Sequence, residues 1–208
     1  MASRKKKRKR RKRFKVYFAR FIFMLVLLAL IGAAAFLCYK GLNFFASNKG
    51  GGNSKDVDVT TVTINKDGSI SEVMVDDFDE SIYDEEQLIS MVNEEISRYG
   101  KSAAFDGLEV ADGKVKLSLS FETDEVCSGF NDTVFFSDTM ENLKSRGVQL
   151  PGEALMAGGD KAVVVSESMD VKVPKKIKYA SPGAVISDKD SKKVSVTIAE
   201  GENAVIVY

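Results

Sequence analysis

The residues of this chain that are best suited to chemistry are carboxylates, and they crowd one short segment. Seven acidic residues lie within eleven positions, namely Asp76, Asp77, Asp79, Glu80, Asp84, Glu85 and Glu86. Calcium binds oxygen ligands of this kind, but no register of the segment has the glycine and the glutamate that an EF-hand loop requires. We therefore expect a solvated acidic face that caps a helix, no cofactor, and a metal site only as a weak alternative at Asp76, Asp77 and Asp79.

Other catalytic chemistry is limited by what the composition lacks. The 208 residues contain no histidine and two cysteines, Cys38 and Cys127. Histidine-dependent triads and His-ligated zinc are therefore excluded, and an isolated Cys127 is more typical of a small buried side chain than of a nucleophile. Two carboxylates could still hydrolyse a glycoside, provided that the fold sets the separation that this reaction needs. We name no catalytic residue.

The strongest pattern in the chain is a basic stretch followed by an apolar one. Residues 1–20 contain twelve Lys or Arg and no acid, and residues 21–39 contain no charged residue. Nineteen such residues are enough to span a bilayer as a helix, and a basic flank stays on the cytoplasmic side. The sequence thus predicts a transmembrane helix at 21–39, a cytoplasmic amino-terminal tail at 1–20, and membrane lipid as a partner.

The basic residues of the tail are expected to contact the membrane surface. They are Arg4, Lys5, Lys6, Lys7, Arg8, Lys9, Arg10, Arg11, Lys12 and Arg13. Cations beside a membrane helix are attracted to the anionic lipid of the inner leaflet. The same run resembles a nucleic-acid patch, but its position next to the apolar segment favours the lipid interpretation, and we expect no nucleic-acid partner.

Two alternatives stay open for the anchor: cleavage after the small residues at 33–35, and lipidation at Cys38.

The composition changes sharply after the apolar segment. Residues 40–55 include three consecutive glycines, which is typical of a flexible linker. All thirty acids follow residue 55, and the chain from Lys40 onward has 18 basic residues, so its net charge is −12. A negative domain repels nucleic acid and anionic lipid, so we expect this part outside the membrane. Residues 56–208 are numerous enough to form one domain.

Turn signals and periodicity predict the elements of the first half of this domain, residues 56–147. Asp-Gly pairs at 67–68 and 112–113 each separate two β-rich runs and indicate two hairpins. A helix with an apolar stripe is expected between Asp84, which suits the N-cap, and Gly100, which ends it. A short helix after the second hairpin would complete two β-hairpin–helix units. A further helix follows, with Asp138 and Glu141 in the register of a capping box.

The second half, residues 148–208, is expected to consist of strands. Six short runs rich in valine and isoleucine are bounded by turn residues from residue 162 to the end, at spacings typical of an antiparallel meander. The predicted fold class is therefore a single-pass transmembrane helix plus an α+β extracytoplasmic domain, in which two β-hairpin–helix units are followed by an antiparallel β meander.

Four stretches of the domain carry a resemblance to a known family. They are residues 62–88, 107–121, 130–140 and 204–208. In these stretches the chain resembles a family of uncharacterised membrane-attached surface proteins and lipoproteins of Gram-positive bacteria. The resemblance implies a place at the bacterial cell surface. It implies no activity and no catalytic residue.

These patterns indicate a place for the protein more clearly than an activity. We expect a membrane-anchored extracytoplasmic module that binds a protein or polymer of the cell envelope, or has a structural role there. It would lie in the cell membrane with its amino terminus in the cytoplasm and its carboxy-terminal domain outside. The alternative is an envelope hydrolase or transferase that depends on carboxylates. Neither the ligand nor the oligomeric state follows from the sequence.

Overall fold

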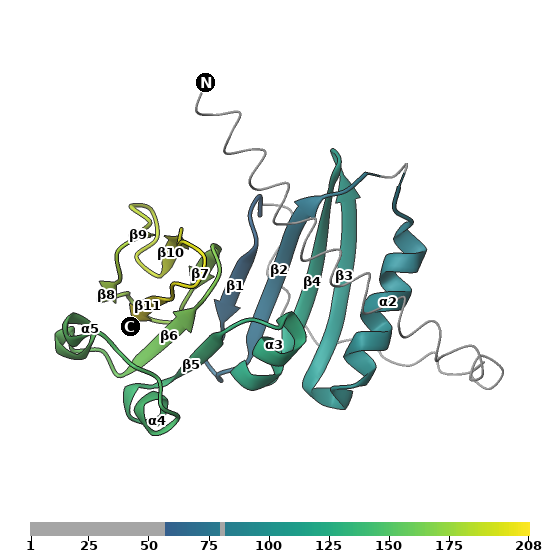
Figure 1. The fold of residues 1–208 in the computed structure, drawn as a ribbon. Coiled ribbons are helices and arrows are strands. Elements are labelled where there is room, and N and C mark those ends of the chain that lie inside the picture. The colour runs from purple at the N-terminus through teal and green to yellow at the C-terminus, as the bar shows by residue number, and fades with distance from the viewer. Residues whose placement is uncertain (1–56, 80–81) are drawn as a thin grey trace. The chain divides into compact units, whose positions relative to one another are not determined.

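Alternation of apolar and polar side chains is typical of the strands in the larger sheet, and strands outnumber helices in the described part of the chain. The computed structural model describes residues 57–79 and 82–208, whose strands form two sheets (Figure 1). The predicted tail at 1–20, the apolar segment at 21–39 and the linker at 40–55 lie outside the described residues.

The larger sheet has seven strands in the order β3-β4-β2-β1-β7-β10-β9. Its strands are β1 (Thr61–Ile64), β2 (Ile70–Asp77), β3 (Ala103–Ala111), β4 (Lys114–Phe121), β7 (Asp170–Lys172), β9 (Ala184–Ile186) and β10 (Lys193–Val196). The β1–β2 and β3–β4 hairpins turn at the two Asp-Gly pairs. Neighbouring strands are antiparallel, except that β1 pairs with β7 in parallel, with Val62 beside Val171. This parallel pair joins the first half of the domain to the second.

The smaller sheet has four antiparallel strands in the order β5-β6-β11-β8. They are β5 (Phe135–Thr139), β6 (Lys161–Val165), β8 (Tyr179–Ala180) and β11 (Ala204–Val207). The two central strands, β6 and β11, are apolar at almost every position and nearly all of their residues are buried. Such continuous apolar runs are typical of strands that are covered on both faces.

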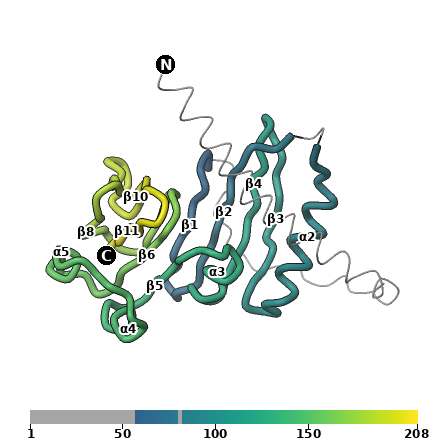
Figure 2. The backbone as a smooth tube through the Cα atoms, in the orientation of Figure 1, coloured from purple at the N-terminus to yellow at the C-terminus, as the bar shows by residue number. Residues whose placement is uncertain are grey.

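The helices are short and lie around the sheets. They are α2 (Glu85–Ser97), α3 (Asp124–Asn131), α4 (Met140–Ser145) and α5 (Gly152–Met156), with a 3-10 turn η2 (Gly100–Ser102). The predicted cap of α2 is confirmed, because the Asp84 carboxylate accepts the N–H of Gln87 at 2.8 Å. In Figure 2, α2 runs beside β3 at one end of the larger sheet. The N-caps of α3 and α4 are threonines, Thr123 and Thr139.

The main core lies on one face of the larger sheet. Side chains such as Ile70, Leu119 and Phe121 belong to the same cluster as Val163 and Ile206 of the smaller sheet. Residues of α2 and α3 complete this cluster. A second, smaller cluster lies on the other face of the smaller sheet, where α4 and α5 supply apolar side chains. The smaller sheet is therefore buried on both faces.

The predicted fold class is wrong. The described residues form a mostly β domain with few helices, and none of these helices is long and apolar enough to cross a membrane. The strands of the second half also do not form one antiparallel meander. Strands β7, β9 and β10 enter the larger sheet, and β6, β8 and β11 enter the smaller one. Strand spacing along the chain predicts that strands follow one another, but it does not predict which distant strand each one pairs with.

Candidate functional site

The predicted acidic candidates follow one another along the chain but do not converge in space. Asp76 and Asp77 are the last residues of β2, and Asp79 comes two residues after the strand. Because neighbouring strand residues face opposite ways, the side chains of Asp76 and Asp77 lie on different faces of the sheet. Burial raises the pKa of Asp76 to about 6. In the part of the chain that the structure describes, no group of three or more His, Cys, Asp or Glu is placed to hold a metal ion.

Two buried carboxylates instead lie at the two ends of α3. Asp124 begins this helix and is 7% exposed, and Glu72 of β2 lies at its other end and is 3% exposed. Both carboxylates make polar contacts that fix α3 to other elements, but the partners differ in charge.

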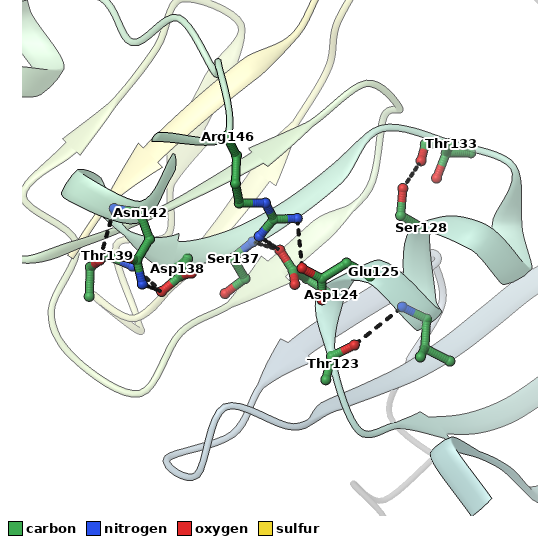
Figure 3. Close-up of polar contacts among 11 residues, drawn as sticks. Thr123, Asp124, Glu125, Ser128, Thr133, Ser137, Asp138, Thr139, Asn142 and Arg146 are labelled. Atoms are coloured by element: carbon green, nitrogen blue, oxygen red, sulfur yellow. Dashed lines mark hydrogen bonds and ion pairs between the residues drawn. The ribbon is translucent and has the colours of Figure 1, made fainter. Parts of the chain in front are cut away.

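Asp124 lies in a contact with a positive charge (Figure 3). Its Oδ2 accepts a hydrogen bond from Nη1 of Arg146 at 2.8 Å and another from the backbone N–H of Ser137 at 2.9 Å. Arg146 also pairs with Glu125, with Nη2 3.1 Å from Oε1. The guanidinium lies 4.8 Å from the centroid of the Phe136 ring. Arg146, the residue that follows α4, thus ties α3 to β5.

The surroundings act on the two carboxylates of this contact in opposite directions. Burial raises the pKa of Asp124, while Ser137 and Arg146 favour its charged form. The hydrogen bond with Asp124 lowers the pKa of Glu125, which is much more exposed. A buried carboxylate with a guanidinium and a backbone N–H as partners has its charge compensated. We regard this contact as a structural anchor of α3.

Glu72 lies in a different environment. It occupies the middle of β2, between Val62 of β1 and Leu119 of β4. Its Oε2 accepts a hydrogen bond from Nδ2 of Asn131 at 2.8 Å, and the same nitrogen lies 3.7 Å from Sγ of Cys127. The Oδ1 of Asn131 is buried and has no hydrogen-bond partner. Among the described residues, no Lys or Arg forms an ion pair with Glu72.

The lack of a cation among these neighbours decides the charge of Glu72. Burial raises the pKa of Glu72 to about 7, the hydrogen bond from Asn131 opposes this shift, and the charge of Glu167 adds to it. Burial also raises the pKa of Glu167. A buried carboxylate without a cation is costly, so the carboxyl group keeps its proton up to about neutral pH. We call Glu72, Cys127, Asn131 and Glu167 the Glu72 cluster.

The Glu72 cluster can bind and release a proton, but its geometry does not activate a nucleophile. Cys127 is 1% exposed, which confirms the prediction of a small buried side chain. Burial, together with the charge of Glu72, raises the pKa of its thiol, so the thiolate is suppressed. The neighbour of the sulfur is the amide of Asn131, which is not a base. An activated cysteine needs a base or a cation beside it.

Sequence reasoning missed Glu72 as a site residue. The apolar residues of β2 indicate a strand, but Ile70 and Val73 lie on opposite faces of it. The register with β4 decides which face of β2 enters the core. Glu72 lies opposite Leu119, and Ile70 and Met74 on the same face lie opposite Phe121 and Leu117. The alternation Ile70-Glu72-Met74 was the signal: aligned with the apolar residues of β4, it places one carboxyl in the core.

The face of the larger sheet opposite to the core forms a second candidate surface. We call it the polar face and define it by Thr63, Ser71, Ser118, Ser120, Lys172, Lys193 and Ser195, which lie at alternate strand positions to the core residues. Five of these residues are cross-strand neighbours in one row, Ser120, Ser71, Thr63, Lys172 and Lys193. The row therefore leads from hydroxyl groups to two adjacent ammonium groups.

A buried carboxylate pairs with one of the two lysines of the polar face. Asp170 is 6% exposed, and its Oδ2 lies 2.7 Å from Nζ of Lys193. Its Oδ1 accepts a hydrogen bond from Oγ of Ser195 at 2.6 Å. Like charges directly opposite each other destabilise a strand pair, and the Asp170 carboxylate offsets this repulsion between Lys172 and Lys193.

No protein-family model, curated protein or solved structure matches this chain. The resemblance to surface proteins of Gram-positive bacteria therefore stays a prediction. Function has to be argued from the residues described above.

The anchor at Asp124 predicts a clear loss of stability when its cation is removed. Arg146→Ala leaves the carboxylate of Asp124 buried with fewer partners, so we expect the free energy of unfolding to fall by about 2 kcal/mol. The control Arg98→Ala removes an exposed ion pair with Glu95 inside α2, which should cost about 0.5 kcal/mol or less. Urea unfolding of the full-length chain measures both. Equal losses would contradict the anchor.

The Glu72 cluster predicts a stability that depends on pH. The folded-state pKa of about 7 exceeds the ordinary value of 4.5, so the folded protein holds the proton more tightly than the unfolded chain. The stability that this proton provides is complete below about pH 4.5 and is lost as the pH rises through 7, by roughly 3 kcal/mol in total. Glu72→Gln should abolish this loss, so the variant should be more stable than the wild type at pH 8.

Urea unfolding at pH 5, 6, 7 and 8 tests this expectation. The variant Glu94→Gln, which removes an exposed carboxyl of α2, controls for the loss of one charge. If the wild type and Glu72→Gln show parallel pH profiles, Glu72 does not hold the proton.

Proposed function

We propose that this chain is a membrane-anchored extracytoplasmic module of the cell envelope that binds an envelope protein or polymer through the polar face, without turnover. The row of hydroxyl and ammonium groups across five strands carries this proposal. Strands lie about 4.8 Å apart, so the row is roughly 19 Å long and suits an extended ligand.

The chemistry of the row favours a ligand with many hydrogen-bonding groups. Hydroxyl groups both donate and accept hydrogen bonds, and ammonium groups donate them. Lys172 adds positive charge at one end of the row, where an anionic group of the ligand would lie, while the charge of Lys193 is paired with Asp170. The strands hold these side chains in a fixed register, which limits the entropy lost on binding.

Support for the proposed location comes from the sequence. The basic residues at 4–13 and the uncharged segment at 21–39 favour attachment to the membrane with the amino terminus in the cytoplasm. The linker at 40–55 would keep the domain near the lipid. The net charge of −12 after the apolar segment suits a domain outside the membrane.

The carboxylate-dependent hydrolase or transferase gains no support from the described geometry. Asp76 and Asp77 lie on opposite faces of β2, so they do not form a pair around one bond. Glu72 has a pKa suited to acid–base chemistry, but its carboxyl group lies in the core beside a protonated thiol. We therefore advance the binding function alone.

A charge reversal on the polar face tests the binding function. Lys172→Glu should weaken retention of the full-length protein on purified cell-wall material, or its crosslinking to envelope proteins, by about tenfold, the equivalent of about 1.4 kcal/mol. The control Lys176→Glu makes the same charge change at an exposed position outside the strands and should leave binding unchanged. Added salt should release the bound protein. Equal binding by both variants would rule out the polar face.

Proteolysis of intact cells tests the location. A non-specific protease should cleave the linker at 40–55 and release the domain into the medium, because a Gly-rich linker is the most accessible backbone outside the membrane. Peptides from residues 1–20 should appear only after lysis. If the domain stays attached to intact cells and is released only after lysis, it faces the cytoplasm.

A further inference from the structure

Glu72 connects two elements that differ in how firmly they are held. Strand β2 is paired along its length with β4 and also with β1, so the backbone at Glu72 is held by strands on both sides. Helix α3 has only eight residues, and an isolated helix of that length is not stable in water. Its position depends on contacts with β4, β5 and the side chains at its two ends. A change in the contact between Glu72 and Asn131 therefore affects α3 before it affects the sheet.

We propose that Glu72 is a proton-dependent latch for α3. With its proton bound, the carboxyl group is neutral and can stay buried, Asn131 donates a hydrogen bond to it, and α3 stays seated on the sheet. When the proton is lost, the carboxy-terminal end of the helix is released. This inference goes beyond the proposed function, because it rests on the core face of the sheet and not on the polar face.

The groups around Glu72 explain why its charged form disfavours the closed state. Cys127 and Asn131 face it from α3, and Glu167 faces it from the segment between β6 and β7. The neighbouring strands place Val62 and Leu119 on either side. Within the described ranges none of these groups is a cation, so ionisation of Glu72 creates a buried charge that only water can compensate.

The buried oxygen of Asn131 adds to the cost of a charge at this site. This oxygen has no hydrogen-bond partner, and a buried amide oxygen without a donor is costly. Ionisation of Glu72 adds a charged acceptor to the same apolar site. Both acceptors gain hydrogen bonds if water enters between α3 and the sheet.

The two ends of α3 determine how it opens. Its amino-terminal end is held by the charge-compensated contact between Asp124 and Arg146. Its carboxy-terminal end closes at Asp132, a non-glycine residue in the left-handed region with φ 51°. Opening starts at Asn131 and must also lift the ring of Phe130 away from those of Phe121 and Tyr99, whose centroids lie 5.3 and 6.0 Å from it. It exposes Cys127, which is buried in the closed state.

The reactivity of Cys127 tests the latch directly. The full-length protein is treated with N-ethylmaleimide between pH 5 and pH 8.5, and modification of Cys127 is followed by peptide mapping, which separates it from Cys38. Dividing the wild-type rate by the Glu72→Gln rate at each pH cancels the intrinsic pH dependence of the thiol. With a pKa for Glu72 of about 7 in the closed state and the ordinary value of 4.5 in the open state, we expect this ratio to rise about tenfold between pH 6 and pH 8. A constant ratio would overturn the latch.

Hydrogen exchange of the wild type provides a test that does not depend on the variant. After correction for intrinsic rates, the amide of Thr133, which bonds to Ser128 at the carboxy-terminal end of α3, should exchange about tenfold faster at pH 8 than at pH 6. The amides of β6 and β11 should keep their corrected rates. If those strands accelerate by the same factor, the proton controls global unfolding and the latch is refuted, and if α3 does not accelerate, it is refuted as well.

Discussion

Side chains of the larger sheet alternate between a core face and the polar face, which also holds the buried Val73, and this alternation places both of the features on which function can rest. On the core face, apolar residues of β1, β2 and β4 enclose the carboxyl group of Glu72. On the other face, hydroxyl groups and two lysines of successive strands form one row. Because the side-chain period of a strand is two, a shift of β2 by one residue would exchange the two faces.

The cost of burying a carboxylate at α3 is offset in two different ways. Asp124 is charge-compensated, since Arg146 and the N–H of Ser137 replace the hydration that burial removes. Glu72 has an amide as its partner, so burial is compensated by a proton instead. One end of the helix is therefore held by an ion pair, and the other by a hydrogen bond to a carboxyl group that keeps its proton up to about neutral pH. A short helix anchored in this asymmetric way can open at one end without loss of the whole fold.

Local signals in the sequence predicted local structure well. The Asp-Gly pairs indicated both hairpins, and Asp84 with Gln87 indicated the start of α2. For α4 the cap is Thr139, one residue beyond the Asp138 that its sequence pattern favoured, because either residue type can accept the N–H of the first helical turn. The predicted fold class was wrong because it depends on contacts between residues far apart in the chain. Each strand of the second half was recognisable, but its partner was not.

The sequence by itself determined what neighbouring residues decide: the turns, the cap of α2, the alternation along each strand, the absence of histidine chemistry, and the separation of a basic amino-terminal stretch from an acidic domain. Only the tertiary structure decided that β1 pairs in parallel with β7, and that Asn131 meets Glu72 across 59 positions of the chain. These contacts depend on the burial of one shared core by elements far apart in sequence. The charge of a carboxyl group depends on whether a cation reaches it there, and no local pattern encodes that distance.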